Sequence, residues 1–384
     1  MLLIKNGKIV TMAGINYENG TILIKNGKII EVGEQIIEQD NMEIIDAKGG
    51  WVLPGLIDAH CHLGMIEEEI GAEGNDLNEM SDPLTPHLRA LDGINPLDPA
   101  FREAVKAGIT TVMSGPGSTN VIGGQFIVIK TKGVSADEMA VMQPAALKIA
   151  LGENPKRIYK GKNKMPMTRM GTTALLRETL IKGLNYKTKK DRAQAKGDNF
   201  DLDIKMEALI PVLEKKIPLK AHAHRADDIL TAIRIAKEFD VSLTIDHCTD
   251  GNLIVEQIKS SGAPVILGPS MTFRTKIETK NKSFDTAVVL NNAGVKLALM
   301  TDHPVTPIEY LPICAGLAVK AGLSMEDGLK SITINAAEIL GVSNRIGSIE
   351  KGKDADIAIY DGNPMEIFTN TLYTIINGRI AYKK

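Results

Sequence analysis

Between about residues 52 and 344, short apolar runs alternate with stretches of helical periodicity, and this alternation restricts the chain to few folds. We expect eight strands, at residues 52–60, 110–114, 126–131, 145–151, 218–222, 241–247, 264–268 and 295–302. Helices are predicted at residues 99–107, 172–195, 202–215, 227–238, 252–260, 283–291 and 325–334. This α/β pattern predicts a (β/α)8 TIM-type barrel with a parallel sheet. The alternative is an open doubly wound sheet, which is disfavoured because no Gly-x-Gly-x-x-Gly turn follows an early strand.

The two ends of the chain share a second pattern, in which β-branched and apolar residues flank an Asn-Gly pair. The pairs are Asn6-Gly7, Asn26-Gly27 and Asn377-Gly378. Each predicts a hairpin, because Asn-Gly suits the two positive-φ positions of a tight turn. The simplest arrangement is one small composite β-sandwich domain, residues 1–52 plus 345–384, with the barrel of residues 53–344 inserted. Two separate β-caps are the alternative.

Composition excludes several classes of protein. The 384 residues are 43% hydrophobic and 24% charged, as in soluble globular proteins, and the net charge of -2 gives no footprint for nucleic acid. No apolar run reaches the roughly 18 residues that span a bilayer, and the first residues already read as a strand, so we expect a cytoplasmic protein without a membrane partner. The cysteines, Cys61, Cys248 and Cys314, form no Cys-x-x-Cys pair, so disulfides are not expected.

Most of the seven histidines fall at the carboxyl ends of predicted strands. They are His60 and His62 on the first strand, His222 and His224 on the fifth and His247 on the sixth, with Asp302 ending the eighth. In a barrel these ends open on one face, where active sites are built. A lone buried histidine is more often a packed core residue, but five of them with a carboxylate form a set suited to Zn²⁺, Mn²⁺ or Fe²⁺. There is room for one or two ions.

The sequence predicts roles other than metal binding for four further histidines and cysteines. His87 lies in a loop rich in proline and acidic residues, so we expect a surface or lid position. His303 follows Asp302, and strand alternation turns it away, which favours a supporting or structural role. Cys61 and Cys248 adjoin predicted ligands but point to the opposite side, so both are interpreted as packing residues.

Residues 51–64, WVLPGLIDAHCHLG, resemble the first barrel strand of the amidohydrolase superfamily. The Asn-Gly hairpins and residues 346–357 resemble its composite β-sandwich, so the likeness extends along nearly the whole chain. Residues 220–224 (KAHAH) and 301–304 (TDHP) are most similar to its imidazolonepropionase and prolidase-like branch of metal-dependent hydrolases. The resemblance implies that the metal ligands are His60, His62, His222, His247 and Asp302, and that Asp302 is also the general base.

In this family a carboxylated lysine or a glutamate often bridges two metals, and the sequence offers Lys148 and Glu153. Lys148 alternates with bulky apolar neighbours, which turns it inward if those neighbours pack on the helices. A buried ammonium is unfavourable, so Lys148 requires carboxylation or a nearby anion. Glu153 follows the strand at loop height and needs no modification, so it is slightly preferred, and both remain open.

The predicted reaction is hydrolysis of a carbon–nitrogen bond, in an amide or cyclic amide, by a metal-activated hydroxide. Asp302 takes the proton and returns it to the leaving nitrogen, while His224 or Arg225 holds the substrate carboxylate or the oxyanion. The acidic loop 64–99 and the basic stretch 156–169 are candidate lids. A heterocycle deaminase and a dipeptidase are alternatives on the same site, and a non-catalytic barrel scaffold is a third. The sandwich edges and the resemblance favour a homo-oligomer acting on a small molecule.

Overall fold

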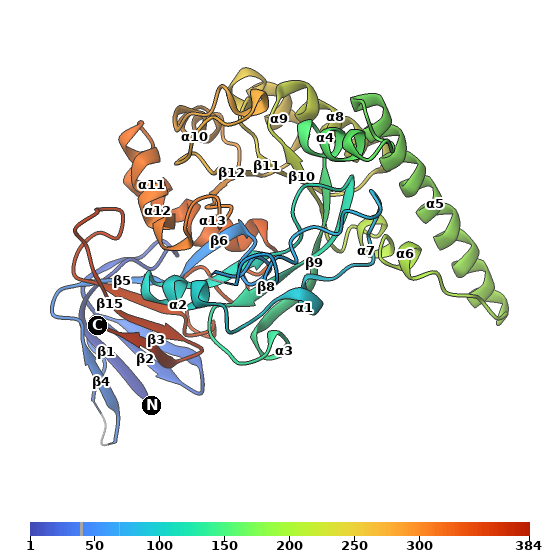
Figure 1. The fold of residues 1–384 in the computed structure, drawn as a ribbon. Helices are drawn as coiled ribbons and strands as arrows, with labels where there is room; N and C mark the ends of the chain where they lie inside the picture. The colour runs from blue at the N-terminus through green and yellow to red at the C-terminus, as the bar shows by residue number, and fades with distance from the viewer. Residues whose placement is uncertain (39–40, 69) are drawn as a thin grey trace.

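The computed structural model describes residues 1–38, 41–68 and 70–384, and their strands form two sheets (Figure 1). The first sheet has the order β16-β15-β14-β5-β1-β2-β3, with β4 paired to β1. Its strands are β1 (Leu2–Ile9), β2 (Tyr17–Lys25), β3 (Lys28–Gly33), β4 (Glu43–Asp46), β5 (Trp51–Pro54), β14 (Ile357–Tyr360), β15 (Thr371–Ile376) and β16 (Arg379–Lys383). Because β5 pairs with both β1 and β14, the two ends of the chain share one sheet. The predicted composite β-domain is confirmed, and the predicted boundary after residue 52 falls inside β5.

Two of the three predicted hairpins are present, and one is wrong. Asn26-Gly27 joins β2 to β3 and Asn377-Gly378 joins β15 to β16, all with positive φ. The first pair instead lies inside the continuous strand β1, where the register with β2 shifts on both sides of Gly7. This Asn-Gly forms a bulge because the chain beyond it continues straight on to pair with β5.

The second sheet has the order β13-β12-β11-β10-β9-β8-β7-β6 and closes into the barrel. Its strands are β6 (Leu56–Cys61), β7 (Ile109–Ser114), β8 (Ile122–Lys130), β9 (Ala140–Ala150), β10 (Leu219–Ala223), β11 (Leu243–His247), β12 (Val265–Leu267) and β13 (Leu297–Leu299). The end strands β13 and β6 contact each other, and Asp302 N donates to His60 O at 3.2 Å just beyond them. The barrel predicted from the alternation is confirmed.

Two details of the barrel differ from the prediction. The predicted strand 52–60 is two strands, β5 and β6, divided at Gly55, where a Cβ would lie 2.2 Å from the Thr110 side chain. The sheet is also not fully parallel, since β8 runs antiparallel to β7 and β9. Residues 115–121 connect β7 to β8 without a helix, and so short a segment cannot make the crossover that parallel strands need.

The longer helices are α2 (Pro99–Lys106), α4 (Glu153–Gly161), α5 (Arg169–Lys196), α8 (Ala226–Phe239), α9 (Val255–Ser261), α10 (Asp285–Asn292), α11 (Leu311–Lys320), α12 (Met325–Ser331) and α13 (Ile334–Ile339). Most of these helices surround the barrel, whereas the C-terminal end of α5 projects away from it (Figure 1), and six of them correspond to predicted ranges: α2, α5, α8, α9, α10 and α12. Shorter turns are α1 (Ala90–Gly93), α3 (Ala136–Met139), α6 (Ile204–Glu207), α7 (Ile210–Leu213), η1 (Gly251–Leu253), η2 (Ile277–Thr279) and η3 (Ile308–Tyr310).

Four helical regions differ from the prediction: α4 lies in a stretch interpreted as a loop, and α13 begins at the last residue of the predicted helix 325–334. The predicted helix 202–215 is divided into α6 and α7, because Pro211 fits the first turn of α7 but not the interior of a longer helix. Helix α11 was not predicted, since its sequence is apolar on most sides and shows little 3.6-residue period. Among the described residues, none of the helices is both long and apolar enough to cross a bilayer.

Gly108 supports the contact between the barrel and the terminal sheet, and we predict that Gly108→Ala destabilises the chain. Its φ is +83°, and a Cβ would lie 2.0 Å from Tyr360 Oη. Gly197, at the end of α5, is the matched control, because its φ of +72° is similar but its Cβ would meet nothing within 4 Å. In both variants an alanine at positive φ lowers the free energy of unfolding by about 1–2 kcal/mol. In Gly108→Ala the clash with Tyr360 lowers it by about 1–3 kcal/mol more. Urea unfolding measures the difference; equal losses in the two variants would contradict this packing role.

Candidate metal centre

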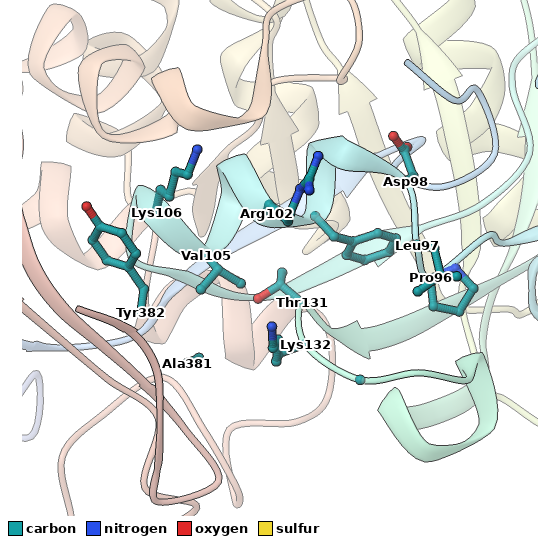
Figure 2. A pocket seen from close by; sticks show the side chains of 12 residues that line it. Pro96, Leu97, Asp98, Arg102, Val105, Lys106, Thr131, Lys132, Ala381 and Tyr382 are labelled. Carbon is teal, nitrogen blue, oxygen red and sulfur yellow. The ribbon is translucent and has the colours of Figure 1, made fainter. Parts of the chain in front are cut away.

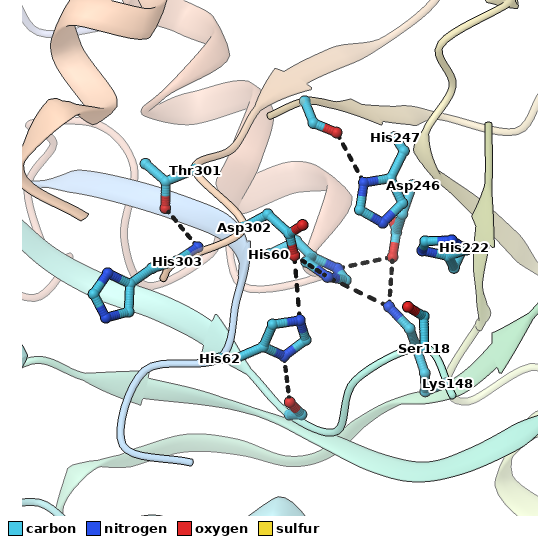
Figure 3. Close-up of polar contacts among 12 residues, drawn as sticks. His60, His62, Ser118, Lys148, His222, Asp246, His247, Thr301, Asp302 and His303 are labelled. Atoms are coloured by element: carbon cyan, nitrogen blue, oxygen red, sulfur yellow. Dashed lines mark hydrogen bonds and ion pairs between the residues drawn. The ribbon is translucent and has the colours of Figure 1, made fainter. Parts of the chain in front are cut away.

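The barrel brings the predicted strand-end residues together at one face (Figure 3). They form two groups whose ligand atoms lie within 4.8 Å of one another: His60, His62 and Asp302, and His222, His224 and His247. The first group comes from the ends of β6 and β13, and the second from β10 and β11. The five histidines are buried, with 7% or less of each residue exposed. Residues far apart in sequence therefore share one enclosed site, as the barrel topology dictates.

The backbone is strained where two of these residues leave their strands. His247 has a φ of +70° and Asp302 a φ of +54°, a left-handed conformation that disfavours side chains with a Cβ. Such strain is tolerated when the surrounding structure fixes it, and it concentrates at functional sites.

Polar contacts at Nδ1 orient three of the imidazoles, two through hydrogen bonds to backbone carbonyls and one through a carboxylate. His62 Nδ1 donates to Gly115 O at 2.7 Å, and His247 Nδ1 donates to Gly268 O at 2.8 Å. His60 Nδ1 lies 2.9 Å from Asp246 Oδ2. With the proton held at Nδ1, each Nε2 presents a lone pair, which is the usual arrangement of a metal-binding histidine.

The first group consists of acceptors that face one another. Asp302 Oδ1 lies 3.2 Å from His62 Nε2 and 3.4 Å from His60 Nε2. Burial, together with the charge of Lys148, lowers the pKa of His60 to about 4, so its imidazole is neutral at physiological pH. Burial raises the pKa of Asp302, but its contacts with His60 and His62 outweigh this and hold the pKa well below its usual range. Lone pairs and a carboxylate that converge in this way fit a divalent cation between them.

The second group consists of three imidazoles that are neutral at physiological pH. Burial lowers the pKa of His222, His224 and His247 below the usual histidine value. Their ring centroids are 4.3–4.8 Å apart, and His224 Nδ1 hydrogen-bonds with Thr249 Oγ1 at 2.8 Å. The structure thus places His224, which the sequence assigned to substrate binding, beside the predicted ligands His222 and His247. The signal was present in the alternate spacing of His222 and His224 on one strand.

The two candidate bridging residues differ in position. Lys148 is fully buried, and its Nζ lies 3.3 Å from His60 Nε2 and 3.8 Å from Asp246 Oδ2. Glu153 begins α4 and does not line the cavity above the histidines, whereas Lys148 does. The positive φ of Gly152 turns the chain just before Glu153. The geometry therefore favours Lys148, against the slight preference for Glu153 from the sequence.

Arg225, His303 and His87 lie outside the two groups. The Arg225 guanidinium is 42% exposed and pairs with Asp227 Oδ1 at 2.9 Å, at the beginning of α8 rather than in the cavity. His303 is buried, and its Nδ1 accepts a hydrogen bond from Ile308 N at 3.1 Å. Of these three side chains, none lines the cavity of the two groups.

Sequence reasoning missed several buried charged residues around the site, including Asp246, Lys220 and Glu278. Asp246 contacts His60, and its Oδ1 lies 3.2 Å from Lys220 Nζ. Strand alternation should turn Asp246 away from the side of His247, but the left-handed φ of His247 breaks that alternation.

Glu278 is 2% exposed, with Oε1 3.8 Å from His222 Nε2. Burial raises the pKa of Glu278, but the contact with His222 outweighs burial and leaves the pKa at about 2. Glu278 lies in the short 3-10 turn η2, where no periodicity distinguishes it in the sequence.

A cavity of about 410 Å³ opens above the two groups. Both predicted lid segments contribute to it, through Leu77 and Asn78 from one and Arg157 from the other. A third segment, residues 269–282, was not singled out from the sequence, and it contributes lining residues that include Lys276 and Lys282.

A separate cavity of about 380 Å³ lies between α2 and the C-terminal strand β16 (Figure 2). Arg102, Lys106, Lys132 and Tyr382 contribute to its lining, and no histidine is among its lining residues. The chemistry expected from the histidine pattern therefore belongs to the cavity at the barrel mouth.

Comparison with known proteins agrees with this architecture. The Amidohydrolase family matches residues 206–381. A crystal structure of an amidohydrolase from Thermotoga maritima MSB8 is 45% identical, with full coverage of both chains and a TM-score of 0.97. The imidazolonepropionase of Colwellia psychrerythraea is 25% identical over 358 aligned residues, covering 86% of this chain and 81% of that protein. Amidohydrolase tasK of Hapsidospora irregularis is 27% identical over 366 residues, covering 88% of this chain, which spans only 37% of tasK.

The barrel, the terminal sheet and these matches show that the chain belongs to the amidohydrolase superfamily, a class of hydrolases acting on carbon–nitrogen bonds. Within it, the chain falls in the imidazolonepropionase-like branch. Residues 51–64, 220–224 and 301–304 predicted membership of this superfamily and of this branch, and both predictions are confirmed.

Proposed function

We propose that the chain is a metal-dependent amidohydrolase that cleaves an amide or cyclic amide by attack of water. The observation that carries this proposal is the convergence of five buried imidazoles and one carboxylate in a single site. A divalent ion held there, Zn²⁺ or alternatively Mn²⁺ or Fe²⁺, would lower the pKa of water from about 16 to near 7 and would polarise the carbonyl. His60, His62 and Asp302 would hold one ion, and His222 and His247, with His224 beside them, a second.

Asp302 is the proposed general base. Its side chain is 13% exposed and lines the cavity, so a water molecule can reach it. The low pKa keeps its carboxylate ionised at neutral pH. In this role Asp302 takes the proton of the attacking water and passes it to the leaving nitrogen as the carbon–nitrogen bond breaks.

Lys148 is the proposed bridging residue, in its carboxylated form. Burial lowers the pKa of Lys148 to about 8, which increases the fraction of neutral amine at physiological pH. The neutral amine attacks carbon dioxide, forms a nitrogen–carbon bond and releases one proton, and the product is an anionic carbamate. This change replaces a buried cation beside His60 with two oxygen donors.

The proposal is tested by removing and restoring the metal. After dialysis against a chelator we expect hydrolysis of a panel of N-acyl amino acids, dipeptides and cyclic amides to be lost, and Zn²⁺, Mn²⁺ or Fe²⁺ to restore it. Released ammonia would indicate a deaminase, and a released free amino acid from dipeptides a dipeptidase. Full activity in the metal-free protein would contradict the proposal.

The cavity of about 410 Å³ has the size of small-molecule sites, so a small substrate is part of this proposal. A homo-oligomer and a cytoplasmic location stay predictions from the sequence.

A further inference from the structure

Lys282 is a buried cation on the wall of the metal-centre cavity. Only 9% of the residue is exposed, and it lines the cavity together with Asp302 and the second histidine group. Its backbone is fixed on both sides: Lys282 N donates to Thr279 O at 3.1 Å, and Lys282 O accepts from Arg274 Nη2 at 2.7 Å. Among the described residues, no hydrogen-bond acceptor or carboxylate pairs with its Nζ.

The surroundings of Lys282 add positive charge. Burial lowers the pKa of Lys282, and the nearby cations Lys276 and Arg274 act in the same direction, against the charge of Asp302. Asp302 is already engaged with His60 and His62 and does not pair with Lys282. Burying an ammonium without a counter-ion is unfavourable, so this position is better suited to binding an anion than to stabilising the fold.

The other cations of the cavity differ from Lys282. Lys276 Nζ donates to Asn154 Oδ1 at 2.8 Å and lies 3.7 Å from Glu278 Oε1, so it has partners. Arg157 is exposed on α4. Lys282 thus combines burial, an unpaired head group and a place in the cavity.

We propose that Lys282 is the residue that binds the substrate carboxylate and so determines which amides the enzyme prefers. This inference rests on the proposed function, because the bond to be cut must lie at the metal centre. It assigns to Lys282 the anchoring role that the sequence suggested for Arg225 or His224. A hydrogen bond between a charged donor and a carboxylate in a partly dry cavity has the strength to determine specificity.

Binding to the metal-loaded protein tests the inference without turnover. The probes are pairs of hydroxamates, which chelate metals: the monohydroxamate of succinic, glutaric or adipic acid, each with an analogue in which methyl replaces the carboxylate. Wild type is expected to prefer the carboxylate member of at least one pair. In Lys282→Met that member should bind about 10- to 100-fold more weakly, while the neutral member is unchanged. An unchanged preference in Lys282→Met would overturn the inference.

Two further variants separate binding from folding. Lys280→Met is the matched control, because Lys280 is exposed two residues away, and it should bind both probes like wild type. Lys282→Arg keeps the charge and should retain part of the preference. The Tm of Lys282→Met should be equal to or above that of wild type, since an unpaired buried charge is removed; a markedly lower Tm would indicate a structural role instead.

The substrate panel completes the test. N-acyl amino acids are compared with the matching N-acyl amino alcohols, in which hydroxymethyl replaces the carboxylate. Loss of the carboxylate preference in Lys282→Met, with turnover of the amino alcohols retained, supports the inference. Hydrolysis of both members equally by wild type overturns it and leaves the proposed function intact. Failure of every hydroxamate to bind contradicts the metal centre itself, and the inference with it.

Discussion

Asp302→Asn is expected to lower kcat/KM by about 1,000-fold or more and to leave the fold unchanged, because the amide cannot accept the proton of the attacking water. The substitution keeps the size of the side chain, and the backbone bond from Asp302 N to His60 O is unaffected. The measurement is steady-state hydrolysis of whichever panel substrate wild type cleaves, with circular dichroism to confirm folding.

Asp201→Asn, at an exposed position, is the control and should match wild type. Metal content should fall only in part in Asp302→Asn, since an amide oxygen is a weaker ligand than a carboxylate. Full activity in Asp302→Asn would remove Asp302 from the mechanism.

Lys148→Ala is the second substitution with a large expected effect. If the carboxylated Lys148 bridges two ions, its loss should reduce kcat by about 1,000-fold and lower the metal content. Lys148 is fully buried, so the truncation leaves a cavity next to His60 into which a small carboxylate fits. Added acetate should therefore restore part of the activity.

Glu153→Gln is the matched comparison for Lys148→Ala, because Glu153 is the other predicted bridging residue and does not line the cavity. We expect near-wild-type activity and metal content for Glu153→Gln. The opposite result, an inactive Glu153→Gln beside an active Lys148→Ala, would assign the bridge to Glu153.

The parts of the fold that could be predicted from sequence are those with a strong local period. Eight strands alternating with helices predicted the barrel. Positions at the strand ends predicted that five residues lie together at one site: His60, His62, His222, His247 and Asp302. These residues could be placed because the ends of barrel strands converge whatever the details of the loops.

The parts that failed depend on contacts distant in sequence. Asn6-Gly7 has the same local sequence as the two true turns, and only the continuation of β1 along β5 makes it a bulge. The reversed direction of β8 follows from the short connection between β7 and β8, which contains no helix and cannot make the crossover of a parallel pair. Asp246 was missed because the strained φ of His247 reverses the expected alternation.

Loop residues were the hardest to place. Glu278 and Lys282 lie in the segment after β12, which has no period and many charges, so nothing local distinguishes them from solvated residues. Their burial follows from the position of that segment over the cavity, together with residues from the other loops. The choice between Lys148 and Glu153 likewise depended on the turn at Gly152, which the sequence does not determine.

Elemental analysis of the purified wild-type chain, together with its response to a chelator, tests the central claim most directly. The two groups of ligand atoms predict two divalent ions per chain, lost together with hydrolytic activity on chelation and regained when the metal is returned. A chain that contains no divalent metal and hydrolyses its substrate at full rate in the presence of chelator would contradict the account.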